Sequence, residues 1–257
     1  MTLSPHQKVS VALYILSVFV AFLYSDIFTP PQTYFSTKGN ILNVFFIKKG
    51  WFWVTVVYGC YVYFVLSKRW STQQVTQSIY RFTCVTVYWY VMTQWLLGPS
   101  FIDRVYVATG GSCTPPAYDD GDVSTQQQQL TLLLSQTFRQ STCRQLGGRW
   151  SGGHDVSGHC VMLIHASLFF WEELSWLFYS IPAATQLKRT QPSAWRSFLA
   201  VLALLVLWWW MLVMTAIYFH GHFELVSGCI FGVLGWASLY LGLFPNLPVI
   251  GLPPQSL

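Results

Sequence analysis

The sequence predicts an all-α membrane protein with six transmembrane helices and a long loop between the third and the fourth. Two observations predict this class. Of the 257 residues, 53% are hydrophobic and 9% are charged, whereas about 25% of residues are charged in a typical soluble domain. Long runs of Leu, Val, Phe, Tyr and Trp also occur almost without Asp, Glu, Lys or Arg, which is typical of helices that face lipid.

Six apolar runs approach the length of about 20 residues that a helix needs to cross a bilayer. Basic residues precede the first run, as in a signal peptide, but Tyr24-Ser25-Asp26 lacks a small-residue cleavage pattern, so we interpret this run as a retained helix. The chain is then a single polytopic membrane domain, residues 1–257. The predicted helices are about Val9–Tyr24, Val44–Leu66, Ile79–Leu97, His159–Ile181, Ser197–Phe219 and Phe223–Phe244, with a loop at about 98–158.

Basic residues in two short connections predict the orientation. They are Lys68, Arg69 and Arg81 after the second helix and Lys188, Arg189 and Arg196 after the fourth. The positive-inside rule places both connections in the cytosol. With six helices both termini are then cytosolic and the long loop is luminal or extracellular, although Lys48 and Lys49 weigh mildly against this orientation. The net charge of +5 fits topogenic loops, and we expect no nucleic-acid partner.

Two of the six cysteines, Cys113 and Cys143, lie in the long loop, whereas the other four lie in predicted helices. If the loop is luminal, its environment is oxidising, and the sequence therefore predicts a disulfide between these two residues. Two free thiols are the alternative.

Ionisable groups in membrane helices point to function, because each is costly there unless it is paired or hydrated. Asp155, Ser157 and Gly158 directly precede His159 at the start of the fourth helix. Ser157 suits the N-cap position. Exposed backbone N–H groups, the positive helix end and a glycine together predict an anion site that resembles a phosphate loop. An ordinary turn at the point of membrane entry is the alternative.

A second polar group joins the fifth and sixth helices. His220 and Glu224 share one face if the helical conformation continues, and a carboxylate beside an imidazole fixes its tautomer and stabilises its cation. Because the fourth helix begins and the fifth ends on the outer side, His159 and His220 lie at one depth and can share a site. Two imidazoles suit phosphoryl transfer, in which one attacks phosphorus and the other protonates the leaving oxygen. Hydrated interfacial side chains are the alternative.

This chemistry needs no metal and no other cofactor. Deeper in the fourth helix, His165 is expected to pack between helices. Glu172 and Glu173 lie too far from His159 for direct chemistry, so we expect them to line a polar cavity or to pair with another helix. A zinc site would need a third close ligand, and the available residues are His154, His222 and Cys160.

Asp155-Val156-Ser157-Gly158-His159 together with Tyr218-Phe219-His220 resembles the fat storage-inducing transmembrane (FIT) protein family of the endoplasmic reticulum. Other similar segments are Tyr34–Phe46, Gly147-Gly148 with Trp150, Glu172–Ser175 and Gly251–Ser256. The resemblance implies a helical core like that of lipid phosphate phosphatases, in the endoplasmic reticulum membrane, with a luminal active site. It implies hydrolysis of fatty acyl-CoA to acyl-4′-phosphopantetheine and adenosine 3′,5′-bisphosphate, in support of lipid droplet biogenesis and membrane lipid balance.

Carried over through the resemblance, His159 is the leaving-group acid, His220 the nucleophile and Glu224 the orienting carboxylate. The sequence departs from the wider phosphatase pattern, because Val156 replaces a proline, Val213 and Met214 replace a serine–arginine pair, and the first basic motif is missing. The substrate phosphates then need other partners. The candidates, at the outer, luminal side of the second helix, are Lys38, Asn40, Asn43 and Lys48, for which interfacial snorkelling is the alternative.

The expected partners are fatty acyl-CoA as substrate and membrane lipids. The competing interpretation is a non-catalytic scaffold that binds triacylglycerol or diacylglycerol for lipid droplet formation, for which the aromatic clusters at residues 51–53 and 208–210 would serve. A proton-coupled transporter is a weaker alternative, because the sequence has no inverted repeat.

Overall fold

The computed structural model describes residues 3–94, 99–114, 129, 132–134, 139–179, 181–219 and 221–254. The chain divides into two compact units, residues 1–88 with 159–257 and residues 89–158. The main helices are α1 (Pro5–Ile27), α2 (Gly50–Phe64), α3 (Thr72–Thr93), α7 (Gly158–Glu173), α10 (Pro192–Tyr218) and α11 (His222–Ala237). Shorter helices are η1 (Tyr34–Ser36), η2 (Leu42–Ile47), η3 (Leu66–Lys68), α8 (Trp176–Tyr179), α9 (Ile181–Thr190), η4 (Ser238–Leu243) and α12 (Phe244–Asn246).

Four helices in the described part of the chain are long and apolar enough to cross a membrane. They are α1, α2 extended to Lys68, α10, and α11 extended to Asn246. A multi-pass membrane protein is thereby confirmed. The other two predicted spans, α3 and α7, fall short for different reasons. α3 begins in the polar segment 72–77, and the 16 residues of α7 extend about 24 Å, less than the hydrocarbon core of about 30 Å.

Several helix boundaries differ from the prediction. α2 begins at Gly50 instead of Val44, after the π-helix η2, α3 begins at Thr72 instead of Ile79, and α10 begins at Pro192 instead of Ser197. α1 begins at Pro5 instead of Val9, since Pro suits the first turn of a helix and the Ser4 N–H donates to Gln7 Oε1 at 3.0 Å. α7 ends at Glu173 instead of continuing to Ile181. Pro182 lacks an N–H and would clash with the preceding turn of a continuous helix, so it accounts for the start of α9. The earlier break between α7 and α8 lies at Leu174 and Ser175.

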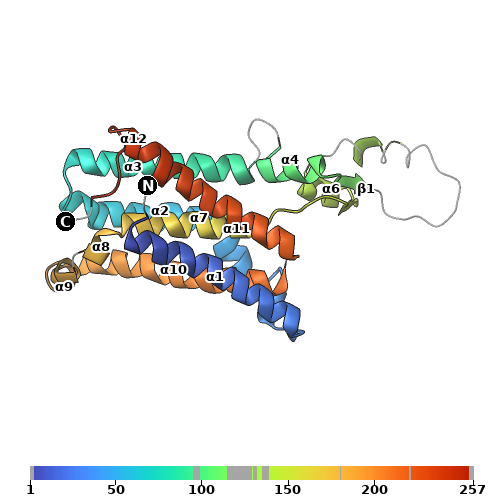
Figure 1. Cartoon of the computed structure of the whole chain (residues 1–257), viewed down its shortest axis with the longest axis horizontal. Helices are drawn as coiled ribbons and strands as arrows, with labels where there is room; N and C mark the ends of the chain where they lie inside the picture. Colours follow the sequence, from blue (N-terminus) through green and yellow to red (C-terminus); the bar gives the residue numbers. More distant parts are fainter. Residues whose placement is uncertain are drawn as a thin grey trace, which may run out of the picture. The chain divides into compact units, whose positions relative to one another are not determined.

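The helix α7 lies at the centre of the first unit. Every residue from Cys160 to Phe170 is buried, as expected for a helix that is apolar on all sides. Its neighbours are α1, α2, α3, α10 and α11 (Figure 1). The contacts include Phe170 with Trp208 of α10, at a ring-centroid distance of 6.2 Å, and a hydrogen bond of 3.1 Å from Trp171 to the Tyr14 hydroxyl of α1.

Small residues allow α11 to approach its neighbours closely. A Cβ at Gly232 would lie 2.9 Å from Cβ of Ile164 in α7, and a Cβ at Gly235 would overlap the ring of Tyr88 in α3. The Tyr88 hydroxyl also donates to the Phe231 carbonyl at 2.7 Å. Membrane helices commonly associate through such small residues, because hydrophobic burial does not hold them together in lipid.

Two names describe the ends of the first unit. The His159 end is where α7 begins, and the Glu172 end is where α7 stops. Both terminal segments of the chain lie at the Glu172 end (Figure 1), since His6 contacts Tyr179 and the Ile250 carbonyl accepts from Arg81. The turn between α10 and α11, the end of α1 and the segment 28–49 lie at the His159 end.

The second unit contains α4 (Phe101–Ala108), β1 (Ser112–Thr114), α6 (Gln140–Gln145) and β2 (Arg149–Ser151) among its described residues. The strands β1 and β2 pair antiparallel, with Cys113 opposite Trp150. A disulfide joins Cys113 to Cys143, whose Cα atoms are 5.8 Å apart. Trp150 packs against this bridge and stacks on Tyr106 at 4.7 Å between ring centroids, so the loop has a small core of its own.

Gly148→Ala is expected to hinder the disulfide. A Cβ at Gly148 would lie 2.5 Å from Cys113 Sγ and 3.0 Å from Cys143 Sγ, and overpacking of this kind costs about 1–3 kcal/mol. Peptide mapping without reductant should detect less of the linked Cys113–Cys143 peptide in this variant. Gly59→Ala is the control, because no atom lies within 4 Å of a Cβ there. Equal linkage in the wild type and Gly148→Ala would contradict the expectation.

Candidate active site

His159 occupies the first turn of α7 and is half-buried. The packing of α7 fixes where this turn lies. Met162, three residues further on, fills the space beside Gly50 at the start of α2, where a Cβ would lie 2.5 Å from the Met162 sulfur. On another side, Ile164 packs against Gly232 of α11. The backbone around His159 is therefore held between the start of α2 and the body of α11.

The turn between α10 and α11 carries the other predicted catalytic residues. His220, the predicted nucleophile, lies outside the described residues. Its neighbours on both sides are described, and Gly221 begins the cap of α11. The Gly221 N–H donates to Glu224 Oε2 at 3.2 Å. Glu224 is half-buried, and its carboxylate is held beside the first residues of the turn, where a negative charge also favours the helix N-terminus.

His222 forms a different pair from the one that includes Glu224. Its Nε2 lies 3.8 Å from Asp26 Oδ1 at the end of α1, and the two side chains are 45% and 60% exposed. The His222 ring also meets Phe22 edge-on, with centroids 4.3 Å apart. α1 and α11 are thus in contact at the His159 end through an exposed imidazole–carboxylate pair and a ring contact.

The segment 28–49 brings Lys38 to the same turn. Lys38 Nζ lies 6.0 Å from the centre of the Phe219 ring, within the range of a cation–π interaction. Two further contacts hold the segment against α10. The Phe35 ring meets Trp210 at 5.7 Å between centroids, and the Tyr218 hydroxyl donates to the Pro31 carbonyl at 3.4 Å. An exposed ammonium group is therefore adjacent to the residue that precedes His220.

The two asparagines shape the backbone that carries Lys38. Asn40 donates from its amide to the Thr37 carbonyl and accepts from the Asn43 N–H, both at 2.8 Å. Asn43 in turn donates to the Lys38 carbonyl at 2.8 Å. Both side chains are buried. Lys48 is exposed and follows the π-helix η2, directly before α2.

The glycine-rich approach to α7 has specific packing requirements in the second unit. Gly152 adopts φ of +96°, a conformation that side chains disfavour. A Cβ at Gly153 would lie 2.8 Å from Gly111 Cα. Ser157 is buried, Asp155 and Gly158 are half-buried, and the His154 N–H donates to the Thr109 hydroxyl at 2.8 Å. These glycines allow two stretches of backbone to approach closely, whether or not an anion binds beside them.

Glu173 pairs with another helix, which is one of the two roles that the sequence predicts for it. Arg81 of α3 makes two hydrogen bonds to its carboxylate, Nε to Oε1 at 2.6 Å and Nη2 to Oε2 at 3.1 Å, and both side chains are 0% exposed. The hydroxyls of Tyr58 and Tyr240 donate to the same carboxylate at 3.0 and 3.3 Å. Arg81 also donates to the Ile250 carbonyl at 3.3 Å. This network joins α2, α3, α7, η4 and the C-terminal segment.

Glu172 binds a second set of partners. Gln7 of α1 and the Trp236 indole of α11 each donate to Oε1 at 2.9 Å, and His6 Nε2 lies 3.2 Å from Oε2. Sequence reasoning did not predict the partners of either glutamate, and it used Arg81 only to predict the orientation of the helices in the membrane. The available signal was the cost of an arginine inside an apolar helix, which requires a buried counter-charge.

His165 has a packing role, as expected. Its Nε2 donates to the Val85 carbonyl of α3 at 3.1 Å, and its ring lies between Trp51 and Tyr88. As for metals, the described residues contain no group of three His, Cys, Asp or Glu side chains that could hold an ion. The polar groups at the His159 end therefore offer imidazole, carboxylate and ammonium chemistry.

Comparisons with known proteins identify a family and several named relatives. A family model described as fat storage-inducing transmembrane protein matches residues 31–196 and 183–240. Acyl-coenzyme A diphosphatase fit1 of Schizosaccharomyces pombe is 35% identical over 210 residues, which cover 81% of this chain and 73% of the relative. Acyl-coenzyme A diphosphatase FITM2 is 30% identical in Xenopus laevis, over 88% of this chain and 78% of the relative. The Homo sapiens FITM2 is 28% identical, over 94% and 85%. No solved structure matches significantly.

Proposed function

Because the chain belongs to the fat storage-inducing transmembrane protein family, we propose that it is a fatty acyl-CoA diphosphatase. The observation that carries the proposal is the similarity of most of the chain to several proteins of that name, among them one that is 35% identical over 210 residues. The substrate is a fatty acyl-CoA, and the bond that breaks joins the two phosphates. The products are acyl-4′-phosphopantetheine and adenosine 3′,5′-bisphosphate.

The proposed mechanism uses two histidines in sequence. The His220 imidazole attacks one phosphorus of the diphosphate, a P–N bond forms and the bridging P–O bond breaks, while protonated His159 gives its proton to the leaving oxygen. His159 then accepts a proton from the water that cleaves the P–N bond and releases the second product. Glu224, whose carboxylate is held at the start of α11, orients His220 and stabilises its cation.

The phosphates are proposed to bind at the His159 end. Lys38 supports this assignment, since its ammonium group lies beside Phe219, and Asn40 and Asn43 hold the backbone on which it is carried. Lys48 adds a second positive charge before α2. Asp155, Ser157 and Gly158 directly precede His159 along the chain, where the backbone N–H groups of the first turn of α7 favour an anion.

The proposed membrane arrangement has six spans, with α3 and α7 added to the four long apolar helices, and residues from about 98 to 158 form the loop of a single polytopic protein. Its support is that α7 is surrounded by α1, α2, α10 and α11, so it lies within the hydrocarbon layer whenever they do. The Glu172 end faces the cytosol by the positive-inside rule, and the His159 end with the disulfide-bonded loop faces the lumen of the endoplasmic reticulum. The proposed enzyme serves lipid droplet formation and phospholipid balance.

Product analysis tests the function. Purified protein is incubated with oleoyl-CoA in detergent, and the products are identified by mass spectrometry, with identically purified His220→Ala as the blank. We expect oleoyl-4′-phosphopantetheine and adenosine 3′,5′-bisphosphate in equal amounts, in wild type alone. A monodisperse wild type that leaves oleoyl-CoA and phosphatidate intact would favour the non-catalytic lipid scaffold instead.

A further inference from the structure

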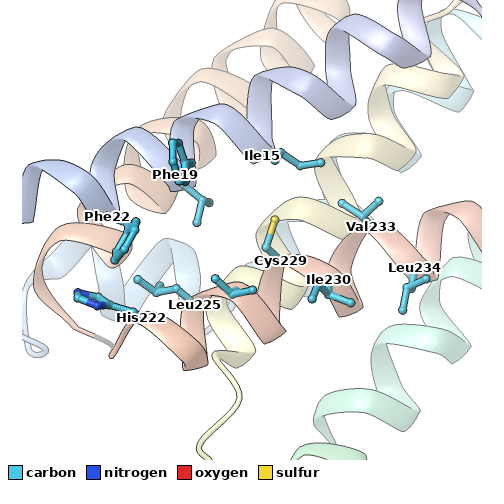
Figure 2. A pocket seen from close by; sticks show the side chains of 11 residues that line it. Ile15, Phe19, Phe22, His222, Leu225, Cys229, Ile230, Val233 and Leu234 are labelled. Atoms are coloured by element: carbon cyan, nitrogen blue, oxygen red, sulfur yellow. The ribbon is translucent and has the colours of Figure 1, made fainter. Parts of the chain in front are cut away.

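An apolar groove runs along the helix pair α1 and α11 (Figure 2). Its volume is about 410 Å³, within the range of sites that bind small ligands. Phe19 and Ile15 of α1 lie on one side, and Leu225, Cys229 and Val233 of α11 lie on the other (Figure 2). Apart from the His222 ring at one end and the thiol of Cys229, the lining is hydrocarbon and aromatic. The groove therefore suits a hydrocarbon chain without a polar headgroup.

Two sets of contacts hold α1 and α11 beside each other, one beyond the Leu234 end of the groove and one at its His222 end. At the Glu172 end, Gln7 of α1 and Trp236 of α11 donate to the same carboxylate oxygen, each at 2.9 Å. At the His159 end, His222 meets Phe22 and lies 3.8 Å from Asp26. These contacts fix how far apart the two helices lie along the groove, whose His222 end stays accessible because the His222 and Asp26 side chains are largely exposed.

The length of the groove is that of part of a fatty acyl chain. From His222 to Leu234 the helix advances 12 residues, or about 18 Å at 1.5 Å per residue. An extended hydrocarbon with C–C bonds of about 1.5 Å advances about 1.3 Å per carbon. Along α11 the groove thus matches about 14 carbons, whereas its α1 lining, from Ile15 to Phe22, advances seven residues, or about 10 Å. The remainder of a longer chain would have to lie outside the groove.

The open end of the groove adjoins the proposed active site. His222 follows the proposed nucleophile His220 by two residues in the same turn. Its side chain and that of Asp26 are 45% and 60% exposed, so this end is hydrated. The phosphopantetheine arm, which has two amides, can cross such a surface, whereas the groove itself has no hydrogen-bond partner for an amide beyond His222 and the Cys229 thiol.

We propose that the groove between α1 and α11 holds the fatty acyl chain of the substrate and that Cys229 and Val233 determine which chain lengths are accepted. This assignment rests on the proposed diphosphatase function and adds to it the site of the acyl chain. The His222 end admits the thioester end of the chain, and the methyl end points toward Glu172. A side chain enlarged at a given depth then excludes the chains that extend past it.

Two tryptophan variants at different depths test the proposal. Cys229 lies seven residues beyond His222 and Val233 lies eleven, so the two depths differ by about 6 Å, or about five carbons. The rate constant kcat/KM is measured for octanoyl-, lauroyl-, palmitoyl- and oleoyl-CoA, and each variant is divided by wild type at the same chain length. We expect Val233→Trp to lose at least about tenfold on palmitoyl- and oleoyl-CoA while octanoyl-CoA is unaffected. Cys229→Trp should lose activity already on shorter acyl chains than Val233→Trp does.

Val213→Trp is the matched control. Val213 of α10 is a half-buried valine that lines a second apolar groove, on the opposite side of α1, so the same substitution adds the same bulk elsewhere. We expect it to leave the chain-length profile unchanged. Val233→Ala provides a variant without added bulk, and it should raise the rate on palmitoyl- and oleoyl-CoA relative to octanoyl-CoA.

The possible outcomes distinguish a failure of the acyl-chain assignment from a failure of the diphosphatase function. A chain-length shift in Val213→Trp but not in Val233→Trp would overturn the assignment, and so would a uniform loss at all chain lengths, which would place the phosphopantetheine arm in the groove. An unchanged profile in all four variants would also overturn it, while the hydrolysis by wild type would leave the diphosphatase function standing. A wild type that hydrolyses none of the four substrates would overturn the function and the acyl-chain site together.

Discussion

His220→Ala and His159→Ala are each expected to lower the rate of acyl-CoA hydrolysis by a factor of at least about 1,000. Without His220 no P–N bond can form, and without His159 the leaving oxygen departs unprotonated. The measurement is the turnover number with saturating oleoyl-CoA in detergent. Because the two groups act as a unit, the double variant should be hardly slower than either single one.

The comparison of other variants makes this prediction specific. Glu224→Gln keeps the size of the side chain and removes the charge that stabilises the His220 cation, so it should lose less activity than His220→Ala. His154→Ala, five residues before His159, is the histidine control and should retain most of the wild-type rate. Comparable losses in His154→Ala and His159→Ala would contradict the proposed role of His159.

Glu173→Ala is expected to lower the free energy of unfolding by about 3–5 kcal/mol, because it leaves the Arg81 guanidinium buried without its counter-charge. Arg81 and Glu173 are both fully buried, and the hydroxyls of Tyr58 and Tyr240 would lose their acceptor as well. Thermal and denaturant unfolding in detergent, followed by tryptophan fluorescence, measures the change.

Two further variants separate the lost pairing from general damage. The double substitution Arg81→Met with Glu173→Leu removes both charges and keeps apolar volume, so it should recover much of the stability that Glu173→Ala loses. Glu224→Ala removes a half-exposed carboxylate from a helix start and should cost no more than about 1 kcal/mol. If Glu173→Ala is as stable as Glu224→Ala, the buried pair has no structural importance.

The apolar runs of the sequence predict the main helices, because lipid exposure and central burial both select hydrophobic residues. They do not predict where α7 ends. Its apolar run continues past Glu173, but α7 stops where Glu172 and Glu173 meet their partners, and Pro182 accounts only for the start of α9. The sequence also does not predict the strands at 112–114 and 149–151, since three-residue strands have no detectable periodicity. These two strands also pair across a long stretch of chain.

The site shows the same division between local and tertiary information. The spacing of His220 and Glu224 is a local feature and can be recognised from the sequence. The approach of Lys38 to Phe219 depends on the fold of segment 28–49 over α10, and the pairing of Arg81 with Glu173 depends on the packing of α3 against α7. A single sequence displays the cost of a buried charge, but it does not identify the group that compensates for it.

The pairing of Arg81 with Glu173 also constrains how the protein is made. The two residues are 92 positions apart in the chain, and ribosomes add about 5–20 residues per second. For about 5–20 s after Arg81 is synthesised, the third helix carries a positive charge whose carboxylate does not yet exist. Helix three cannot take its final position during this interval. If α3 spans the membrane, as proposed, it must wait near the hydrated membrane surface or within the insertion machinery until α7 arrives.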